Sequence, residues 1–497
     1  MKESLGKMLG AVGSLFLIGL FVVAVAPARA DEIGERITAL EQELGQLKGE
    51  QIELRKEAMA AKATLPSFQY RPRSGMRIRA ADKSWELGFG YIFHGRVAFW
   101  PGDQQDAGPS NRTDGEFFAR RNRPSFDYRW NKGFYQLFFQ GDFDSGGDPF
   151  AIQRSTFFVH FERLNPWLPR FHIGMDNPGL VNLHDSNFGS SSSGHLERSM
   201  LVRSTFGVNT SGSTTGFGLT WRRVPLGQGD ATFVFTYIQG QGEGDGAGTD
   251  SDRKDFGLYI GGRPFTKIKN KWVKGIDFGV GFRFANNDTR ADEDGERRIR
   301  IRDHRMVAAD GDGNENRIVL FNSGNVGDGY QNYISPGLGW RIGPYRLRVA
   351  LAWARAEDKF NLDAGAKRGS MFSIANELFV WSKKKGLFTG SANGPHSVML
   401  SWLFERDNGS CRGSGSGVAG FCNADGEFNR NRVLLRELDL WYFIRRNLSV
   451  GVSWLWYDAA NVLAADQSGI GCSRNNATRP GKDCDWHNVV LGLRVGF

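Results

Sequence analysis

The sequence predicts an all-β fold, a transmembrane antiparallel β-barrel of about sixteen strands preceded by a short N-terminal coiled-coil helix. Three observations lead to this prediction. Residues 487–497 alternate in polarity and end on an aromatic residue. A secretory leader opens the chain. The strand-like segments that follow are joined by connections that alternate between short and long.

The closing segment has the period of a strand with one lipid-facing side. One face carries Phe497, Val495, Leu493, Leu491 and Val489, and the other carries Gly496, Arg494, Gly492, Val490 and Asn488. The alternative is an edge strand of a soluble sandwich. An amphipathic last strand that ends on an aromatic residue resembles the closing strand of bacterial outer-membrane barrels. This resemblance implies that Phe497 takes part in assembly by the barrel-assembly machinery.

The first thirty residues read as a signal peptide. Lys2 and Lys7 precede an apolar run over 15–25, and Ala28-Arg29-Ala30 fits a small-x-small cleavage site. The alternative is a retained membrane anchor, but the run is short for a spanning helix. The mean hydropathy of −0.40 is that of a soluble protein. A barrel reconciles export with low hydropathy, because only alternate residues face lipid.

Residues 31–60 are expected to form a periplasmic helix. Its apolar residues recur at steps of four and three, at Ile33, Ile37, Leu40, Leu44 and Leu47. This spacing predicts a short parallel coiled coil, most naturally of three copies beneath a trimeric barrel. Gly34, Gly45 and Gly49 weaken the pattern, and a lone amphipathic helix is the alternative. A proline- and arginine-containing linker is expected over 61–83.

The barrel is expected over 84–497, with an even number of strands as bacterial single-chain barrels have. The predicted strands lie near 84–100, 117–130, 133–143, 151–163, 169–176, 214–223, 231–240, 255–263, 274–285, 329–341, 345–356, 369–383, 394–406, 431–444, 447–458 and 486–497. Connections after even strands are short, such as 131–132. Those after odd strands are mostly long and polar, such as 177–213 and 286–328. This asymmetry is typical of outer-membrane barrels.

The alternation assigns charged residues to the lumen, because a charge near the bilayer midplane costs several kcal/mol. In 345–356, Arg346 and Arg348 alternate with apolar residues, while Arg355 shares the apolar face at the strand end. A polar lumen holds water and indicates a channel. The arginines on or close to inward faces are Arg96, Arg121, Arg123, Arg170, Arg283, Arg346 and Arg348. The alternative is that they brace the wall by pairing with Asp127, Asp142, Asp277 or Glu437.

The barrel region resembles the phosphate-selective porin O and P family. The stretches that carry the resemblance are Phe117-Phe118-Ala119-Arg120-Arg121 with Tyr135-Gln136-Leu137, Ile173-Gly174-Met175-Asp176-Asn177-Pro178, and Leu438-Asp439-Leu440-Trp441-Tyr442-Phe443. The resemblance implies a trimer of sixteen-stranded barrels that pass anions. It also implies a third extracellular loop folded into the pore, and an anion path lined by basic residues.

The connection 177–213 takes the place of that constriction loop. Its candidate residues are His184, His195, Arg198 and Arg203. It contains no lysine, whereas phosphate-selective members place lysines near the constriction. What remains is a wall rich in arginine, whose fixed donors suit phosphate and carboxylate.

The four cysteines lie in two predicted external loops, which favours disulfides in an exported protein. We expect local pairs, Cys411–Cys422 and Cys472–Cys484, with pairing between the loops as the alternative. Their spacing does not suit zinc. The run 310–316 lacks the pattern of a calcium loop, and the serines before His195 lack a nucleophile elbow.

We therefore expect no cofactor, no metal and no enzymatic activity. The net charge of +9 indicates anionic solutes or lipid headgroups, rather than nucleic acid, as binding partners of an exported barrel. The expected function is passive diffusion of small anionic solutes, with phosphate or polyphosphate as candidates, through a homotrimer in contact with outer-membrane lipid. The alternatives are a general porin whose helix also tethers the envelope, and a barrel enzyme such as a protease or lipase.

Overall fold

The structure is a computed structural model that describes residues 30–71, 75–99, 116–143, 150–176, 195, 205–206, 214–239, 254–287, 299–303, 318–322, 329–358, 367–383, 386–388, 395–411, 429–445, 447–460 and 483–496. The chain divides into two units, Met1–Leu65 and Pro66–Phe497. The first contains the helix α2, Ala30–Thr64. Among the described residues, no helix combines the length and the apolarity that crossing a bilayer requires.

Helix α2 is slightly longer than the predicted 31–60 and runs through the three glycines. Its apolar stripe is exposed: Ile37 is 52 % exposed, Leu40 62 % and Leu44 40 %. The described part of the chain supplies no partner for this stripe. The coiled coil stays a prediction.

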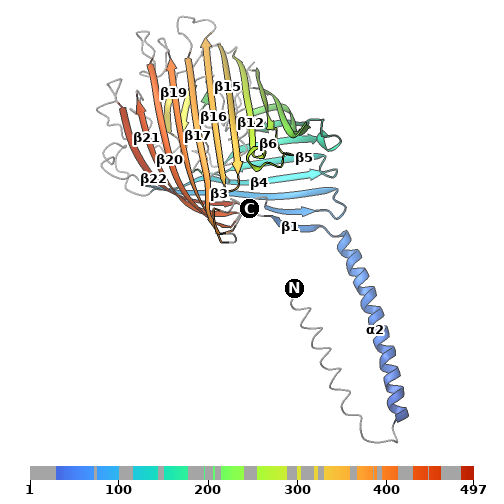
Figure 1. The fold of residues 1–497 in the computed structure, drawn as a ribbon. Coiled ribbons are helices and arrows are strands. Elements are labelled where there is room, and N and C mark those ends of the chain that lie inside the picture. The colour runs from blue at the N-terminus through green and yellow to red at the C-terminus, as the bar shows by residue number, and fades with distance from the viewer. Residues whose placement is uncertain are drawn as a thin grey trace. The chain divides into compact units, whose positions relative to one another are not determined.

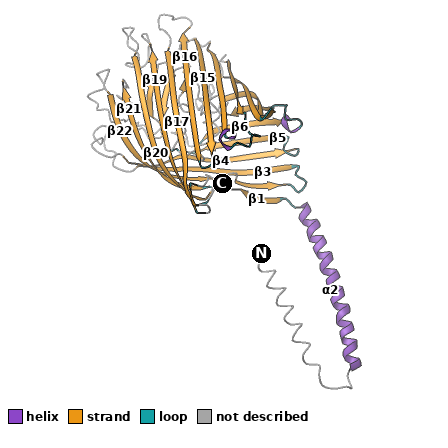
Figure 2. Ribbon diagram, viewed as in Figure 1, coloured by secondary structure: helices purple, strands orange, loops and turns teal. Residues whose placement is uncertain are grey.

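The second unit is a closed sixteen-stranded antiparallel barrel (Figures 1 and 2). Each strand pairs with its neighbours in chain order, and the last pairs with the first. The strands are β3 (Trp85–Phe99), β4 (Glu116–Trp130), β5 (Tyr135–Asp142), β6 (Ala151–His160), β7 (Arg170–Asp176), β9 (Thr214–Leu226), β10 (Gly229–Gln239), β11 (Lys254–Arg263), β12 (Ile276–Asn287), β15 (Gly329–Ile342), β16 (Tyr345–Asp358), β17 (Lys367–Ser382), β19 (Ser397–Cys411), β20 (Asn429–Arg445), β21 (Leu448–Ala460) and β22 (Asp483–Gly496).

All sixteen correspond to the predicted strands. Connections at one end of the barrel are short, and two of them hold η2 (Phe161–Arg163) and α5 (Lys271–Lys274). We call this the turn end, and the opposite end, where the long connections lie, the loop end. The described part of the chain also contains short strands that the sequence did not predict, namely β1 (Ser67–Arg71), β2 (Gly75–Arg79), β8 (Thr205–Phe206), β13 (Ile299–Asp303), β14 (Ile318–Asn322) and β18 (Gly386–Leu387).

Strands β1 and β2 form a hairpin in the segment expected to be a linker. Strand β22 pairs with β3 only from Ile92 onward, so the first residues of β3 lack a partner on that side. Strand β2 fills the gap, with Met76 opposite Phe89. The Nδ2 of Asn447 also donates to the Tyr70 hydroxyl over 2.9 Å. The hairpin therefore completes the edge that the barrel's strand stagger leaves open.

The two faces of the wall differ in polarity. On β12, the outward Phe278, Phe282 and Phe284 are 46 %, 38 % and 43 % exposed, while the inward Arg283 is 7 % exposed. Apolar side chains exposed all along one face require a lipid surround. The barrel therefore spans a membrane, and its polar face lines the lumen.

Part of the lumen is filled by connecting segments. Strands β14, β13 and β8 form a small separate sheet, and β13 lies against β16, β17 and β19. The inward Ala352 and Met371 of those strands are buried, whereas the outward Trp353 is 46 % exposed. The small sheet therefore packs on the inward face of the wall.

Candidate functional site: the inner wall

Basic side chains line the inward face where β3 and β4 pair. Arg96 and Arg121 are buried, at 2 % and 3 % exposed. Arg121 Nη1 donates to His94 Nδ1 over 3.3 Å. Arg123 is bound by a carboxylate instead, since its Nε donates to Asp142 Oδ2 over 2.5 Å. This pair agrees with the alternative that some inward arginines brace the wall.

A second basic group comes from β12 and β16. Arg346 Nη1 donates to Glu377 Oε2 over 3.2 Å, and Arg348 Nη2 donates to Glu377 Oε1 over 2.6 Å. One carboxylate on β17 thus joins two arginines of the neighbouring strand. Arg283 is buried on β12, and Arg170 lies 4.9 Å from the ring centroid of Phe158. The sequence-predicted arginines therefore all lie on the inner wall, but in separate groups.

The part of the wall formed by β19 and β20 is acidic, and of its four carboxylates the sequence pointed only to Glu437. Glu405 and Asp407 on β19 and Glu437 and Asp439 on β20 are 0–1 % exposed. Alternation alone could have placed these four carboxylates inward, because they occupy the same phase as the small residues of their strands. Their burial could not be predicted, since it depends on what fills the lumen beside them.

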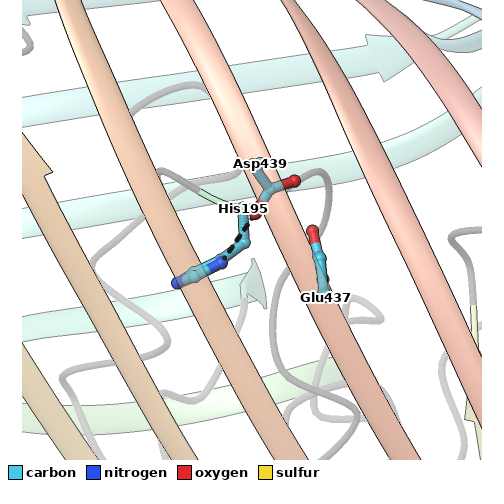
Figure 3. A group of neighbouring side chains, drawn as sticks. All are labelled: His195, Glu437 and Asp439. Atoms are coloured by element: carbon cyan, nitrogen blue, oxygen red, sulfur yellow. Dashed lines mark hydrogen bonds and ion pairs between the residues drawn. The ribbon is translucent and has the colours of Figure 1, made fainter.

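His195 is the one predicted constriction residue in the described part of the chain, and it contacts this acidic wall (Figure 3). Its Nδ1 and Asp439 Oδ2 are hydrogen-bonded over 3.1 Å. Asp439 also accepts from the hydroxyls of Ser401, over 3.1 Å, and Ser453. His195 is 2 % exposed and Asp439 is 1 % exposed. The connection between β7 and β9 therefore enters the barrel and attaches to β20.

An arginine secures the same attachment from β22. Arg494 Nη2 donates to the backbone carbonyl of His195. The Arg494 guanidinium also lies 3.7 Å from the ring centroid of Trp441, a cation–π contact. Gly451 lies opposite Trp441, and a Cβ there would lie 2.4 Å from the indole. A glycine is needed for the indole to lie flat against β21.

The ligand atoms of His195, Glu437 and Asp439 lie within 4.8 Å of one another, and Figure 3 shows the side chains converging. Histidine with two carboxylates is a donor set that suits a transition metal. The Asp439 oxygens, however, already accept from His195 and two serine hydroxyls. The arrangement accordingly works as a hydrogen-bond cluster that joins a connection to the wall.

The remaining predicted residues fall outside the described part of the chain. They are His184, Arg198, Arg203, Cys422, Cys472, Phe497 and the run 310–316. The side chains of Cys411 and Cys484 also lie outside it, so the disulfide pairs stay predictions.

No protein-family model and no curated protein matches this chain. Among solved structures, it is similar to OmpT, an outer membrane protein of Vibrio cholerae, in a loop-deletion form, at 12 % identity and a TM-score of 0.47, over 83 % of this chain and 100 % of that one. It is similar to an anion-selective porin from Comamonas acidovorans at 10 % identity and a TM-score of 0.47, with the same coverage. It is similar to OprB of Pseudomonas putida at 8 % identity and a TM-score of 0.46, over 84 % and 95 %.

At sequence identities this low, the similarity concerns the fold alone and gives no information about the solute that passes through this barrel.

Proposed function

We propose that this protein is an outer-membrane porin through which small anionic solutes diffuse passively. The observation that carries the proposal is a difference in exposure on the inner wall. Side chains of Arg123 and Arg346 are 17 % and 16 % exposed, whereas the Glu377 side chain is 1 % exposed. The carboxylates of β19 and β20 are 0–1 % exposed as well. A solute in the lumen can therefore contact guanidinium groups but not these carboxylates.

Arginine gives an anion planar, permanently charged donors. Several such groups along a wall supply moderate sites rather than one tight site, and conduction requires that each site release its ion. Each of these arginines also keeps part of its hydrogen-bonding capacity, because a guanidinium has five N–H donors and one carboxylate uses at most two. Pairing with Asp142 or Glu377 thus holds a guanidinium in place and leaves donors for a passing anion.

The finer parts of the proposal rest on the sequence. The resemblance to phosphate-selective porins makes phosphate and polyphosphate candidate solutes, and the attachment of the segment around His195 to β20 supports a constriction loop. We further propose that residues 1–30 are removed on export and that α2 lies in the periplasm. Its exposed apolar stripe supports association of three copies.

The exposure of Leu40 and Leu44 also favours a second role, in which α2 of a non-selective porin tethers the outer membrane to another envelope component. We propose no catalytic role for the barrel.

Single-channel recording in planar bilayers tests the proposal. The wild-type reversal potential in a potassium chloride gradient is expected to show anion preference, and added phosphate is expected to reduce chloride current. The double variant Arg123→Gln/Arg346→Gln should lose most of that preference. Arg355→Gln is the matched control, because it removes a charge from the outward face of the strand that carries Arg346. Cation preference of the wild type would refute anion selectivity.

A further inference from the structure

A group of arginines occupies the lipid-facing side of the wall near the loop end. We call it the arginine belt, and it consists of Arg355 on β16, Arg368 on β17, Arg406 on β19, and Arg432 and Arg436 on β20. These four strands are neighbours in the sheet (Figure 1). On β19, Arg406 lies between the buried inward Glu405 and Asp407 and shares its face with Trp402, which is 41 % exposed. The belt therefore points toward lipid.

The position of the belt along the strands corresponds to the headgroup region. Arg355 follows Tyr345, the first residue of β16, by ten positions. At about 3.3 Å per residue and a tilt of roughly 40°, this is about 25 Å of height, the thickness of the apolar band of such barrels. A guanidinium further down would meet hydrocarbon at a cost of several kcal/mol.

Aromatic side chains accompany the belt, as at a membrane interface. Trp353 precedes Arg355 on the same face and is 46 % exposed. Trp456 lies opposite Arg436 and stacks on Trp454, with ring centroids 4.1 Å apart. Aromatic girdles mark the boundary between hydrocarbon and headgroups. The arginines lie at this boundary or beyond it.

The charge of the belt is not balanced by protein carboxylates. Arg355 pairs with Glu357, and Arg432 lies 3.6 Å from Asp458. Among the described residues, no carboxylate pairs with Arg368, Arg406 or Arg436. Five arginines less two carboxylates leave three positive charges.

Two of the belt arginines also repel each other. Arg355 and Arg368 are direct cross-strand partners. Like charges placed opposite each other in a sheet are destabilising. Such a pair is stabilised when an anion lies between the two guanidinium groups.

A furrow of about 1290 Å³ extends from β10 to β20 and passes over these strands. Its outward lining combines guanidinium groups with small polar and aromatic side chains, including Trp353, Arg355, Arg368, Ser370, Arg406 and Asn408. The small Ser370 and Asn408 are cross-strand partners and leave room between larger neighbours. The furrow thus offers anion donors beside apolar surface.

We propose that the arginine belt binds the phosphorylated headgroup of a glycolipid in the outer leaflet. Phosphate matches the geometry of neighbouring guanidinium groups, and basic pockets on membrane proteins bind lipid headgroups in this way. A lipid, rather than a dissolved anion, is the occupant because the belt and furrow face the bilayer and apolar side chains flank the arginines. The site does not depend on which solute the pore conducts.

Native mass spectrometry of the full chain in detergent, titrated with bisphosphorylated lipid A, tests the proposal. The variant Arg368→Gln/Arg406→Gln/Arg436→Gln should bind this lipid about tenfold more weakly, or about 1.4 kcal/mol. Its matched control is Lys271→Gln/Lys274→Gln/Arg445→Gln, which removes the same charge from exposed positions at the turn end and should bind like the wild type. Lipid A stripped of both phosphates should bind the unmutated protein weakly, a result that does not rely on a variant folding.

Three outcomes would overturn the proposal. The first is equal wild-type affinity for the phosphorylated and the stripped lipid. The second is competition by inorganic phosphate alone with the same dependence on the belt arginines, which would make the belt a site for dissolved anions. The third is a triple variant that changes the oligomeric state and keeps its lipid affinity, which would make the belt a contact between copies of this chain.

Discussion

His195 and Asp439 are 244 residues apart in the sequence and are joined by a hydrogen bond of 3.1 Å inside the barrel. The bond connects the segment between β7 and β9 to the far wall, where Arg494 holds the same residue by its carbonyl. His195 therefore lies inside the barrel against β20. It is the described residue with which the proposed constriction can be tested.

We expect His195→Ala to increase the single-channel conductance and the frequency of conductance substates. Loss of the imidazole removes one of the groups that bind the buried Asp439 carboxylate, and a buried acceptor deprived of a donor costs about 1–3 kcal/mol. The thermal midpoint in detergent should therefore fall as well. His172→Ala is the matched control, since His172 is also buried on the inner wall but lies on β7. Unchanged conductance with a lowered midpoint would mean that His195 stabilises the barrel without narrowing it.

Glu162 lies in the η2 turn, outside the membrane-spanning strands. We expect it to make the stability of the folded state sensitive to acid. Burial raises the pKa of this carboxyl, but its hydrogen bonds to His160 Nδ1 and to its own backbone N–H outweigh burial and hold the pKa below its ordinary value of 4.5. The folded state therefore binds the Glu162 proton more weakly than the unfolded state does. The resulting stabilisation is present above the unfolded pKa and is lost as the pH falls through the lower, folded pKa.

Urea unfolding followed by tryptophan fluorescence from pH 7 to pH 3 measures this dependence. The wild type should lose stability below about pH 5, and Glu162→Gln should show a smaller loss over the same range. Glu57→Gln, on the exposed surface of α2, should keep the wild-type slope. Parallel curves for the wild type and Glu162→Gln would contradict the assignment.

The strands could be predicted from the sequence because each carries its own signal, an alternation imposed by lipid on one side and water on the other. Strands β8 and β13 carry no such signal. They pair only because two connections meet inside the lumen, as Arg300 meets Thr205. The inward phase of Arg121 or Arg346 could likewise be predicted, whereas the partner of His195 could not, because a contact over 244 residues depends on where a connection folds. The outward position of Arg355 could be predicted from the alternation within its own strand. The arginine belt could not be predicted, because it depends on how four strands align with one another.

Gly75 should be intolerant of substitution. Its φ is +74°, and a Cβ would lie 1.6 Å from the Phe89 carbonyl oxygen. Gly75→Ala combines backbone strain of about 1–3 kcal/mol with a clash against β3, and it should detach the β1–β2 hairpin. Gly227→Ala separates the two effects, because Gly227 has a φ of +55° and no atom within 4 Å of the added Cβ. Limited proteolysis should cut Gly75→Ala near residues 66–80 and leave Gly227→Ala resistant. Equal protection of both variants would show that β2 shifts to accommodate the methyl group.

The exposed stripe of α2 predicts that the helix associates with copies of itself. Leu40 and Leu44 are 62 % and 40 % exposed, and burying such side chains stabilises by about 1.5–3 kcal/mol each. We expect Leu40→Lys/Leu44→Lys in the full chain to reduce crosslinking between helices and to lower the thermal stability of the oligomer. A photo-activated crosslinker that does not react through amines or thiols measures the first effect, because the added lysines cannot alter its chemistry. Gln42→Lys/Gln46→Lys adds the same charge at two exposed residues on the far face of the helix and serves as control. The contrary outcome is a Leu40→Lys/Leu44→Lys variant that keeps its crosslinks and conductance in cells that lose envelope integrity. The stripe would then bind another envelope component, because the leucines would be needed for the envelope but not for the porin oligomer.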